Sequence, residues 1–175
     1  MGRIAAVVLA AGEASRFGAP KQALLLPEVI ARVSESRVDD TVVVEGAYEL
    51  ACVESTQARV VRCAEWSRGP GASLRCGLAA LAGDVDAAVV VLADGPDLAP
   101  DSIGRVVDAW RAGAGDVVAA SYAGARGHPL LVGRAVWADV PDEGLRAWQP
   151  VLVPCDDLGS PGDVDVPGDL PDRYR

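Results

Sequence analysis

The stretch LAAGEASRFGAPK, from Leu9 to Lys21, follows directly on an apolar run from Ile4 to Leu9. An apolar run without polar alternation is typical of a strand buried on both faces of a parallel sheet. The small residues after it let backbone N–H groups approach an anion closely, as a phosphate-binding loop requires. Arg16 and Lys21 add two positive charges, and we expect both side chains to be exposed. The stretch therefore predicts a strand followed by a loop that holds a nucleoside triphosphate.

This loop differs from two better-known phosphate-binding patterns. It is not a Walker A loop, because no G-K-[ST] follows its second glycine, and it does not contain G-x-G-x-x-G. The alternative interpretation is a tight turn between a strand and a helix, with charges that are merely solvated.

Strand and helix patterns alternate along the chain. Further apolar runs bounded by turn residues are Thr41 to Val44, Arg59 to Cys63, Ala87 to Leu92, Asp116 to Ala120 and Val151 to Val153. Helical periodicity is clearest over Ala72 to Leu81 and over Pro100 to Ala112, where Pro100 suits a first helical position. Such alternation indicates βαβ units, and 175 residues fit one domain. We predict a single-domain α/β three-layer sandwich over residues 1–175, with a mostly parallel sheet.

Composition narrows the class of protein. A formal net charge of -9 argues against a nucleic-acid binder, because nucleic-acid binding needs a basic surface. The cysteines, Cys52, Cys63, Cys76 and Cys155, lack C-x-x-C spacing, so we expect reduced thiols and neither a zinc site nor a disulfide scaffold. The first apolar run is too short to span a membrane and lacks a signal-peptide layout. We expect a cytoplasmic protein.

Two further segments carry candidate site residues. In WSRGPGASLRCG, Trp66 to Gly77, a Gly-Pro-Gly turn precedes Ser73 in the first turn of a helix, where free N–H groups favour an anion or a base carbonyl. Ser73 could equally be a first-turn residue without a ligand. In LADGP, Asp94 follows a buried strand at the carboxyl edge of the sheet, where such folds bind ligands. A turn-capping role is the alternative for Asp94.

A carboxylate beside phosphate-binding loops suits Mg²⁺, which prefers one or two carboxylates plus substrate phosphate oxygens. Asp163 and Asp165 offer a second carboxylate, although the acidic segment Asp156 to Asp172 reads as disordered on composition alone. His128, the only histidine, stands beside a proline and is interpreted mainly as a turn residue rather than a general base. The tryptophans Trp110, Trp137 and Trp148 are interpreted as packing residues.

Together these segments resemble the MobA-like nucleotidyltransferases, and within them the molybdenum cofactor cytidylyltransferases. The resemblance rests on five motifs in the family's order: LAAGEASRFGAPK, GPGASLRCGL (Gly69 to Leu78), LADGPDLAP (Leu92 to Pro100), GHPLL (Gly127 to Leu131) and DVDVPGDL (Asp163 to Leu170). It implies one Rossmann-like α/β domain that binds a nucleoside triphosphate with Mg²⁺. It further implies transfer of the nucleoside monophosphate to a phosphorylated acceptor, with release of pyrophosphate.

The resemblance also implies roles for individual residues. Leu9, Ala10, Ala11 and Gly12 would bind the nucleotide, the last three along the base and ribose, while Arg16 and Lys21 would hold the phosphates and act in catalysis. Asp94 would be the principal, catalytic metal ligand and Asp165 the second. Ser73 remains a candidate for nucleotide binding. The acidic C-terminal segment then becomes part of the site.

The LAAG start favours CTP over GTP, and the resemblance implies a molybdopterin-type acceptor and a possible molybdoenzyme partner. The chain departs from the family after Lys21, where the usual G-x-x-L-L turn is shortened before Val29 to Val33. It departs again at PDEGLR, Pro141 to Arg146, and at Val166 and Gly168, which puts the acceptor in question. Two alternatives stay open: a nucleotidyltransferase for a sugar phosphate or other small phosphorylated metabolite, and a non-catalytic carrier of the cofactor.

Overall fold

The computed structural model describes residues 2–13, 21–51 and 57–174. Within these ranges one sheet has the strand order β3-β2-β1-β4-β6-β5-β7. Its strands are β1 (Arg3–Leu9), β2 (Asp40–Glu45), β3 (Arg59–Arg62), β4 (Val85–Leu92), β5 (Val117–Tyr122), β6 (Ala125–Gly133) and β7 (Val151–Pro154). Of these strands β6 is antiparallel to both its neighbours, and all other pairings are parallel. The predicted mostly parallel sheet is confirmed.

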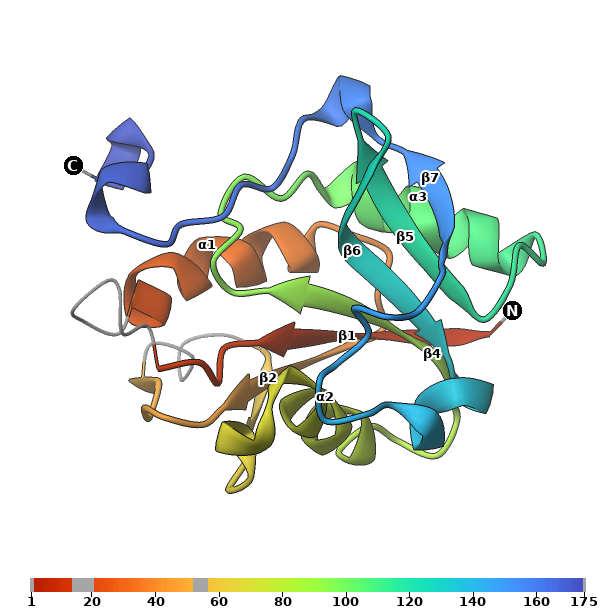
Figure 1. The fold of residues 1–175 in the computed structure, drawn as a ribbon, viewed down its shortest axis with the longest axis horizontal. Coiled ribbons are helices and arrows are strands. Elements are labelled where there is room, and N and C mark those ends of the chain that lie inside the picture. Colours follow the sequence, from red (N-terminus) through yellow and green to blue (C-terminus); the bar gives the residue numbers. More distant parts are fainter. Residues whose placement is uncertain (1, 14–20, 52–56, 175) are drawn as a thin grey trace.

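Helices cover both faces of this sheet. They are α1 (Lys21–Ser34), α2 (Pro70–Ala79) and α3 (Pro100–Arg111). Figure 1 shows α1 and α3 on one face and α2 on the other. Short 3₁₀ turns complete the chain: η2 (Trp66–Arg68), η3 (Arg134–Asp139), η4 (Asp156–Leu158), η5 (Pro167–Asp169) and η6 (Asp172–Tyr174). The predicted three-layer α/β sandwich is confirmed. None of the helices in the described ranges is long and apolar enough to cross a membrane.

The central strand β1 explains how the layers hold together. Alternate residues point to opposite faces of a strand. Ile4, Ala6 and Val8 join the apolar cluster beneath α1 and α3, whereas Ala5 and Val7 join the cluster beneath α2. All five residues are fully buried. The apolar run therefore fills both cores at once, as a doubly covered parallel strand must.

Helix α1 begins at Lys21, earlier than the sequence pattern indicates. The segment Leu24 to Pro27, which looked like a shortened turn, lies inside the helix. Leu25, Leu26, Val29, Ile30 and Val33 are its buried apolar residues. Pro27 removes one helical hydrogen bond, but the burial of this apolar face holds the helix together.

Strand β6 was missed because its first half is polar. Arg126 and His128 interrupt the apolar pattern, and His128 lies within this strand rather than in the expected turn, with a cis peptide bond to Pro129. The hairpin before it turns on Ala123 and Gly124, which both have positive φ, as a two-residue hairpin requires. An alanine at such a position gives no turn signal in the sequence.

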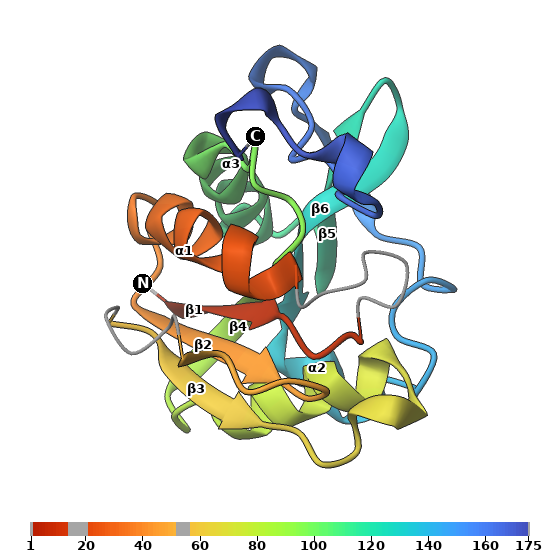
Figure 2. The same cartoon turned by 90° about the vertical axis from the view of Figure 1, so that its left-hand side faces the viewer.

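The C-terminal segment is ordered against the sheet edge, contrary to the expectation from its composition. Figure 2 looks onto this edge and shows the segment beside the start of α1. Arg173 donates to Glu28 in α1 at 3.0 Å and to Asp97 at 2.7 Å, and the Tyr174 hydroxyl also bonds to Glu28. These bonds fasten the end of the chain to α1 and to the loop after β4.

Candidate active site

A cavity of about 450 Å³ opens at the carboxyl ends of β1 and β4. Its lining comes from the loop after β1, the start of α1, the segment from η2 into α2, the end of β4 and the C-terminal segment. The described residues that line it are Leu9, Ala11, Gly12, Lys21, Gln22, Trp66, Ser67, Gly69, Pro70, Ser73, Leu92, Ala93, Asp94 and Asp165. Cavities of this size suit small-molecule ligands. Segments that are far apart in sequence therefore meet at the predicted edge.

The charged centre of the cavity is Lys21, the only lysine in the chain. Its Nζ lies 3.1 Å from Asp94 Oδ2 and 3.7 Å from Asp165 Oδ1, and it also donates to the backbone carbonyl of Val164. The Lys21 side chain is only 8% exposed, whereas those of Asp94 and Asp165 are 26% and 37% exposed. The expectation of an exposed Lys21 was wrong, because the C-terminal segment covers it.

Backbone contacts bring Asp165 to Asp94. The Val164 amide donates to the Asp94 carbonyl at 3.1 Å, and the Asp97 amide donates to the Pro161 carbonyl at 3.0 Å. The C-terminal segment thus follows the loop after β4 and places residue 165 beside residue 94. Asp163 lines a different cavity, so it does not share this site with Asp94.

Of the predicted nucleotide-binding residues that the structure describes, Ala10 is not part of the cavity lining. Ala10 is buried, and its amide donates to the Val44 carbonyl at 2.9 Å, so it extends the β1–β2 pairing. Arg16 lies outside the described residues. The other predicted residues, Leu9, Ala11, Gly12, Lys21, Ser73, Asp94 and Asp165, all line the cavity.

The first turn of α2 does not offer the free amides expected of it. Pro70 has no N–H, the Gly71 amide donates to the Asp142 carbonyl at 2.9 Å, and the Ala72 amide donates to the Gly69 carbonyl at 3.1 Å. Ser73 is 4% exposed and lines the cavity. Any contact from this turn to a ligand therefore falls to the Ser73 side chain rather than to the helix amides.

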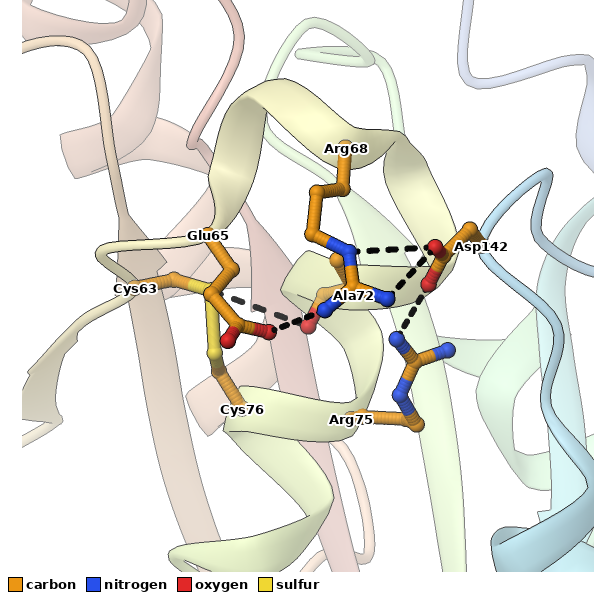
Figure 3. The surroundings of a disulfide bond; sticks show 7 residues. All are labelled: Cys63, Glu65, Arg68, Ala72, Arg75, Cys76 and Asp142. Atoms are coloured by element: carbon orange, nitrogen blue, oxygen red, sulfur yellow. Dashed lines mark hydrogen bonds and ion pairs between the residues drawn. A yellow bond between two sulfur atoms is a disulfide. The ribbon is translucent and has the colours of Figure 1, made fainter.

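The loop that contains PDEGLR, Pro141 to Arg146, contacts the same first turn of α2. Arg68 donates to Asp142 at 2.9 Å, and Arg75 pairs with the same carboxylate (Figure 3). Hydrogen bonds from Arg75 and Arg68 lower the pKa of Asp142. A Cβ at Gly71 would overlap the Pro141 carbonyl. Glycine is therefore required where the helix approaches the loop backbone.

A disulfide corrects the prediction of reduced thiols. Cys63, just after β3, is bonded to Cys76 in α2, and their Cα atoms lie 5.8 Å apart (Figure 3). The spacing between them gave no C-x-x-C signal, but the turn at η2 folds α2 back against the end of β3. Cys155 is a free, buried thiol, and burial raises its pKa. Cys52 lies outside the described residues.

Gln22 and Trp66 are among the lining residues that sequence reasoning did not name as site residues. Gln22 is 5% exposed, and its Nε2 donates to the Gly12 carbonyl at 2.9 Å, which ties the loop after β1 to α1. Its Oε1 is buried without a hydrogen-bond partner in the described structure. Trp66 also lines the cavity, whereas Trp110, Trp137 and Trp148 pack against the cores as predicted. The position of Gln22 next to Lys21 was the available signal.

Asp94 and Asp165 are the carboxylates among the described residues that line this cavity. Within the described ranges, no group of three or more His, Cys, Asp or Glu residues could hold a metal by itself. Two partly exposed carboxylates offer hard oxygen ligands, which match Mg²⁺ or Mn²⁺ when phosphate oxygens supply further ligands. The residues present therefore fit a divalent cation that arrives with a nucleotide.

A second cavity, of about 340 Å³, opens next to the first and shares Leu9, Pro70 and Leu92 with it. Its lining includes His128. Burial, and to a lesser extent the charge of Arg126, lower the pKa of His128 to about 4, although the charge of Asp94 opposes both effects. His128 is therefore neutral at pH 7 and lies within electrostatic reach of Asp94.

Comparison with solved structures shows the same fold. The Rv0371c protein of Mycobacterium tuberculosis is 27% identical, with a TM-score of 0.76 over 96% of this chain and 95% of that one. A nucleotidyl transferase from Methanothermobacter is 23% identical, with a TM-score of 0.72 over 97% of this chain and 94% of that one. A manganese complex of Rv0371c aligns at 24% identity over 97% of this chain and 93% of that one, with a TM-score of 0.69.

Comparison by sequence gives two results. No curated protein matches the chain significantly. The family model for the MobA-like NTP transferase domain matches residues 6–149, which include Lys21 and Asp94 and end before Asp165. The chain therefore belongs to the MobA-like NTP transferase domain family.

Proposed function

We propose that the chain is a Mg²⁺-dependent cytidylyltransferase that moves CMP from CTP onto a phosphorylated acceptor of the molybdopterin type. The family and the fold support nucleotide transfer in general. The observation that carries the proposal is the contact of the Lys21 ammonium with both Asp94 and Asp165 inside the larger cavity. One cation and two carboxylates suit a metal–triphosphate substrate better than a neutral ligand.

In this proposal the triphosphate lies along Leu9, Ala11 and Gly12, with its phosphates toward Lys21. Asp94 and Asp165 hold the divalent cation, which would neutralise phosphate charge when bound. The manganese complex of the Rv0371c protein is in keeping with such an ion. The catalytic unit then extends beyond the family match at residue 149, because Asp165 belongs to it.

The reaction requires one bond to form and one to break. An acceptor phosphate oxygen attacks the α-phosphorus, and the bond from that phosphorus to the leaving pyrophosphate oxygen breaks. No protein nucleophile takes part, so alignment and electrostatic stabilisation by Lys21 supply the catalysis. We propose that Arg16 adds a second positive charge on the leaving group. Ser73 would contact the nucleotide through its hydroxyl.

A nucleotide-by-acceptor screen for pyrophosphate release tests the proposal. CTP, GTP, ATP and UTP are each incubated with molybdopterin or with sugar phosphates, with and without Mg²⁺. We expect Mg²⁺-dependent release that is greatest with CTP and molybdopterin. Pyrophosphate release only with a sugar phosphate would show that the acceptor is a sugar phosphate rather than molybdopterin. No release with any pair of nucleotide and acceptor would contradict nucleotide transfer and favour a non-catalytic carrier.

A further inference from the structure

The C-terminal segment contacts one face of α1 at two places. At the first, Asp165 lies 3.7 Å from the Lys21 ammonium. At the second, Arg173 donates to the Glu28 carboxylate at 3.0 Å, and the Tyr174 hydroxyl donates to the same carboxylate. Residues seven apart in a helix lie on the same face, two turns from each other. The segment therefore lies along the face of α1 that Lys21 and Glu28 share (Figure 2).

Arg173 also connects α1 to the loop that follows β4. While its Nε donates to Glu28, its Nη2 donates to Asp97 at 2.7 Å. A guanidinium group suits this bridge, because its planar fork presents several donors in fixed directions. The two elements that it joins supply the charged centre of the larger cavity, since α1 begins at Lys21 and the loop after β4 contains Asp94. We call Glu28, Asp97, Arg173 and Tyr174 the C-terminal clasp.

The clasp contains hydrogen bonds to an ionised acceptor. Burial raises the pKa of Glu28, but hydrogen bonds from Tyr174 and two arginines outweigh burial and lower this pKa below its usual value. Burial and the bond to Glu28 raise the pKa of Tyr174 to about 12. At pH 7 a charged carboxylate therefore accepts from a guanidinium group and from a neutral phenol. Such bonds are stronger than those between two neutral groups.

Polar contacts rather than apolar packing hold the chain beyond Val164. Val164 is 2% exposed, whereas none of the described residues 165–174 is buried. Within this stretch the Asp169 carboxylate accepts from the amides of Asp165 at 3.1 Å and Val166 at 3.0 Å, which closes a local turn. A segment without buried apolar side chains opens at low cost in free energy. Loss of the clasp should therefore let Asp165 move away from its place in the site.

We propose that the C-terminal clasp holds Asp165 beside Asp94 and thereby sets how tightly the site binds a divalent cation together with a nucleotide. The proposal rests on the proposed function, which places the cation on these two carboxylates. Arg173 and Tyr174 are positioning residues, because neither lines the described part of the cavity and both act through Glu28. Groups that orient metal ligands commonly change metal affinity by about 10- to 100-fold when they are removed.

Binding of Mn²⁺ in the presence of CTP tests the proposal without any acceptor. Electron paramagnetic resonance measures the free Mn²⁺ during a titration of wild type and of Arg173→Met. We expect the variant to bind Mn²⁺ about 10- to 100-fold more weakly. Its melting temperature should stay nearly unchanged, because the Arg173 side chain is 41% exposed and exposed ion pairs contribute little to stability. Equal binding of Mn²⁺ by the two proteins would overturn the proposal.

A double-mutant cycle tests whether the clasp acts as a unit. Glu28→Gln removes the charge that Arg173 contacts, so it should also weaken Mn²⁺ binding. Because the two residues share one contact, the double variant should bind Mn²⁺ no more weakly than Arg173→Met. Losses that add up in the double variant would show that the two residues act separately, and would overturn the clasp.

The matched control is Arg105→Met, which removes another arginine that holds the C-terminal segment. Arg105 of α3 pairs with Asp157 at 2.6 Å, and its side chain is 37% exposed. The bond from the Val164 amide to the Asp94 carbonyl lies between that pair and Asp165 in the chain. Mn²⁺ binding should therefore be unchanged in Arg105→Met. Equal weakening in both arginine variants would show a general loosening and would overturn the proposal.

A signal from metal-free protein tests the position of Asp165 directly. Carbon-13 labelling of lysine reports on Lys21 alone, and we expect its side-chain signal to shift in Arg173→Met but not in Arg105→Met. An unchanged signal in Arg173→Met would contradict the clasp. If the wild type binds Mn²⁺ with CTP and Arg173→Met binds it equally, only the clasp fails and the proposed function stands. If the wild type binds no Mn²⁺ with CTP, the metal site of the proposed function fails, and the clasp fails with it.

Discussion

Lys21 is the only lysine of the chain, and its ammonium group contacts two carboxylates of the larger cavity. A protein labelled with carbon-13 only in lysine therefore gives one side-chain signal that reports on this site. When a metal–triphosphate complex enters, the ammonium must exchange carboxylate neighbours for phosphate oxygens. This residue is where the charge balance of the proposed reaction can be measured.

Lys21→Met should lower turnover by at least about 100-fold, because it removes a charge that stabilises the transferring phosphates. It should also lower the free energy of unfolding by about 1–3 kcal/mol, since Asp94 loses a partly buried partner. Pyrophosphate release and urea denaturation measure the two effects. Lys21→Arg, which keeps the charge, is the control and should retain more activity. Unchanged turnover in Lys21→Met would contradict the assignment.

His128 predicts a pH dependence of stability. Its folded pKa of about 4 lies below the unfolded value of about 6.5, so the unfolded chain binds more protons between these values. Stability contributed by neutral His128 is therefore fully present above about pH 6.5 and is lost as the pH falls toward 4, by at most about 3 kcal/mol. Denaturation of wild type and His128→Gln between pH 4 and 7 measures it. Parallel curves for the two proteins would contradict the prediction.

At the scale of the elements, α2 lies closer to the sheet than a side chain would allow. A Cβ at Gly77 would come within 2.5 Å of Val7 Cγ1 and 2.8 Å of Val44 Cγ2, both buried in strands β1 and β2. Gly77 therefore permits the close packing that positions Ser73 one turn earlier in the same helix. Periodicity cannot reveal this requirement, because it depends on the distance between two layers.

Gly77→Ala should destabilise the fold by about 1–3 kcal/mol through overpacking, although alanine favours helices. Gly104→Ala in α3 is a matched control, because nothing lies within 4 Å of its added Cβ. It should stabilise the protein by about 0.5–1 kcal/mol. Thermal denaturation of both variants tests the pair, and a stabilised Gly77→Ala would contradict the described packing.

The disulfide closes a chain segment that supplies much of one wall of the cavity. Trp66, Ser67, Gly69, Pro70 and Ser73 all lie between Cys63 and Cys76 in the chain. Reducing the disulfide raises the conformational entropy of this segment in the unfolded chain and removes a covalent constraint on it in the folded chain.

Cys76→Ala should therefore lower the free energy of unfolding by about 3 kcal/mol and weaken nucleotide binding. Reductant should affect the wild type in the same direction and leave Cys76→Ala unchanged. Denaturation and calorimetry with CTP, each with and without reductant, measure this. If reductant weakened nucleotide binding to both proteins equally, the effect would not arise from this bond.

For the molecule as a whole, the sequence predicted most of the architecture. The apolar runs predicted every strand of the described structure except β6. The strands β1, β2, β4 and β5 are largely buried and contain few polar residues, and the mostly exposed edge strands β3 and β7 still carry two or three consecutive apolar residues. Helices α2 and α3 followed from periodicity. Strand β6 was not predicted because Arg126 and His128 interrupt its apolar pattern. The disulfide was not predicted because Cys63 and Cys76 come together only when α2 folds back against the end of β3.

The candidate site was predictable in part. Leu9, Ala11, Gly12, Lys21 and Asp94 could be predicted from the local sequence, because each follows or flanks a recognisable strand or helix. The acidic C-terminal segment offered both Asp163 and Asp165, and only the resemblance singled out Asp165, since its place depends on the backbone bond between Val164 and Asp94. The second cavity was not predicted, because it needs an antiparallel strand to reach the edge where the parallel strands end.

The central claim is the transfer of a nucleoside monophosphate at the Lys21 site. It is tested most directly by incubating CTP radiolabelled at the α-phosphate with Mg²⁺, molybdopterin and wild-type protein or Asp94→Asn. The account predicts that label moves to the acceptor with wild type, that none attaches to the protein, and that Asp94→Asn loses at least about 100-fold in rate. Label that remained in CTP, became fixed to the protein, or moved equally fast with Asp94→Asn would contradict the account.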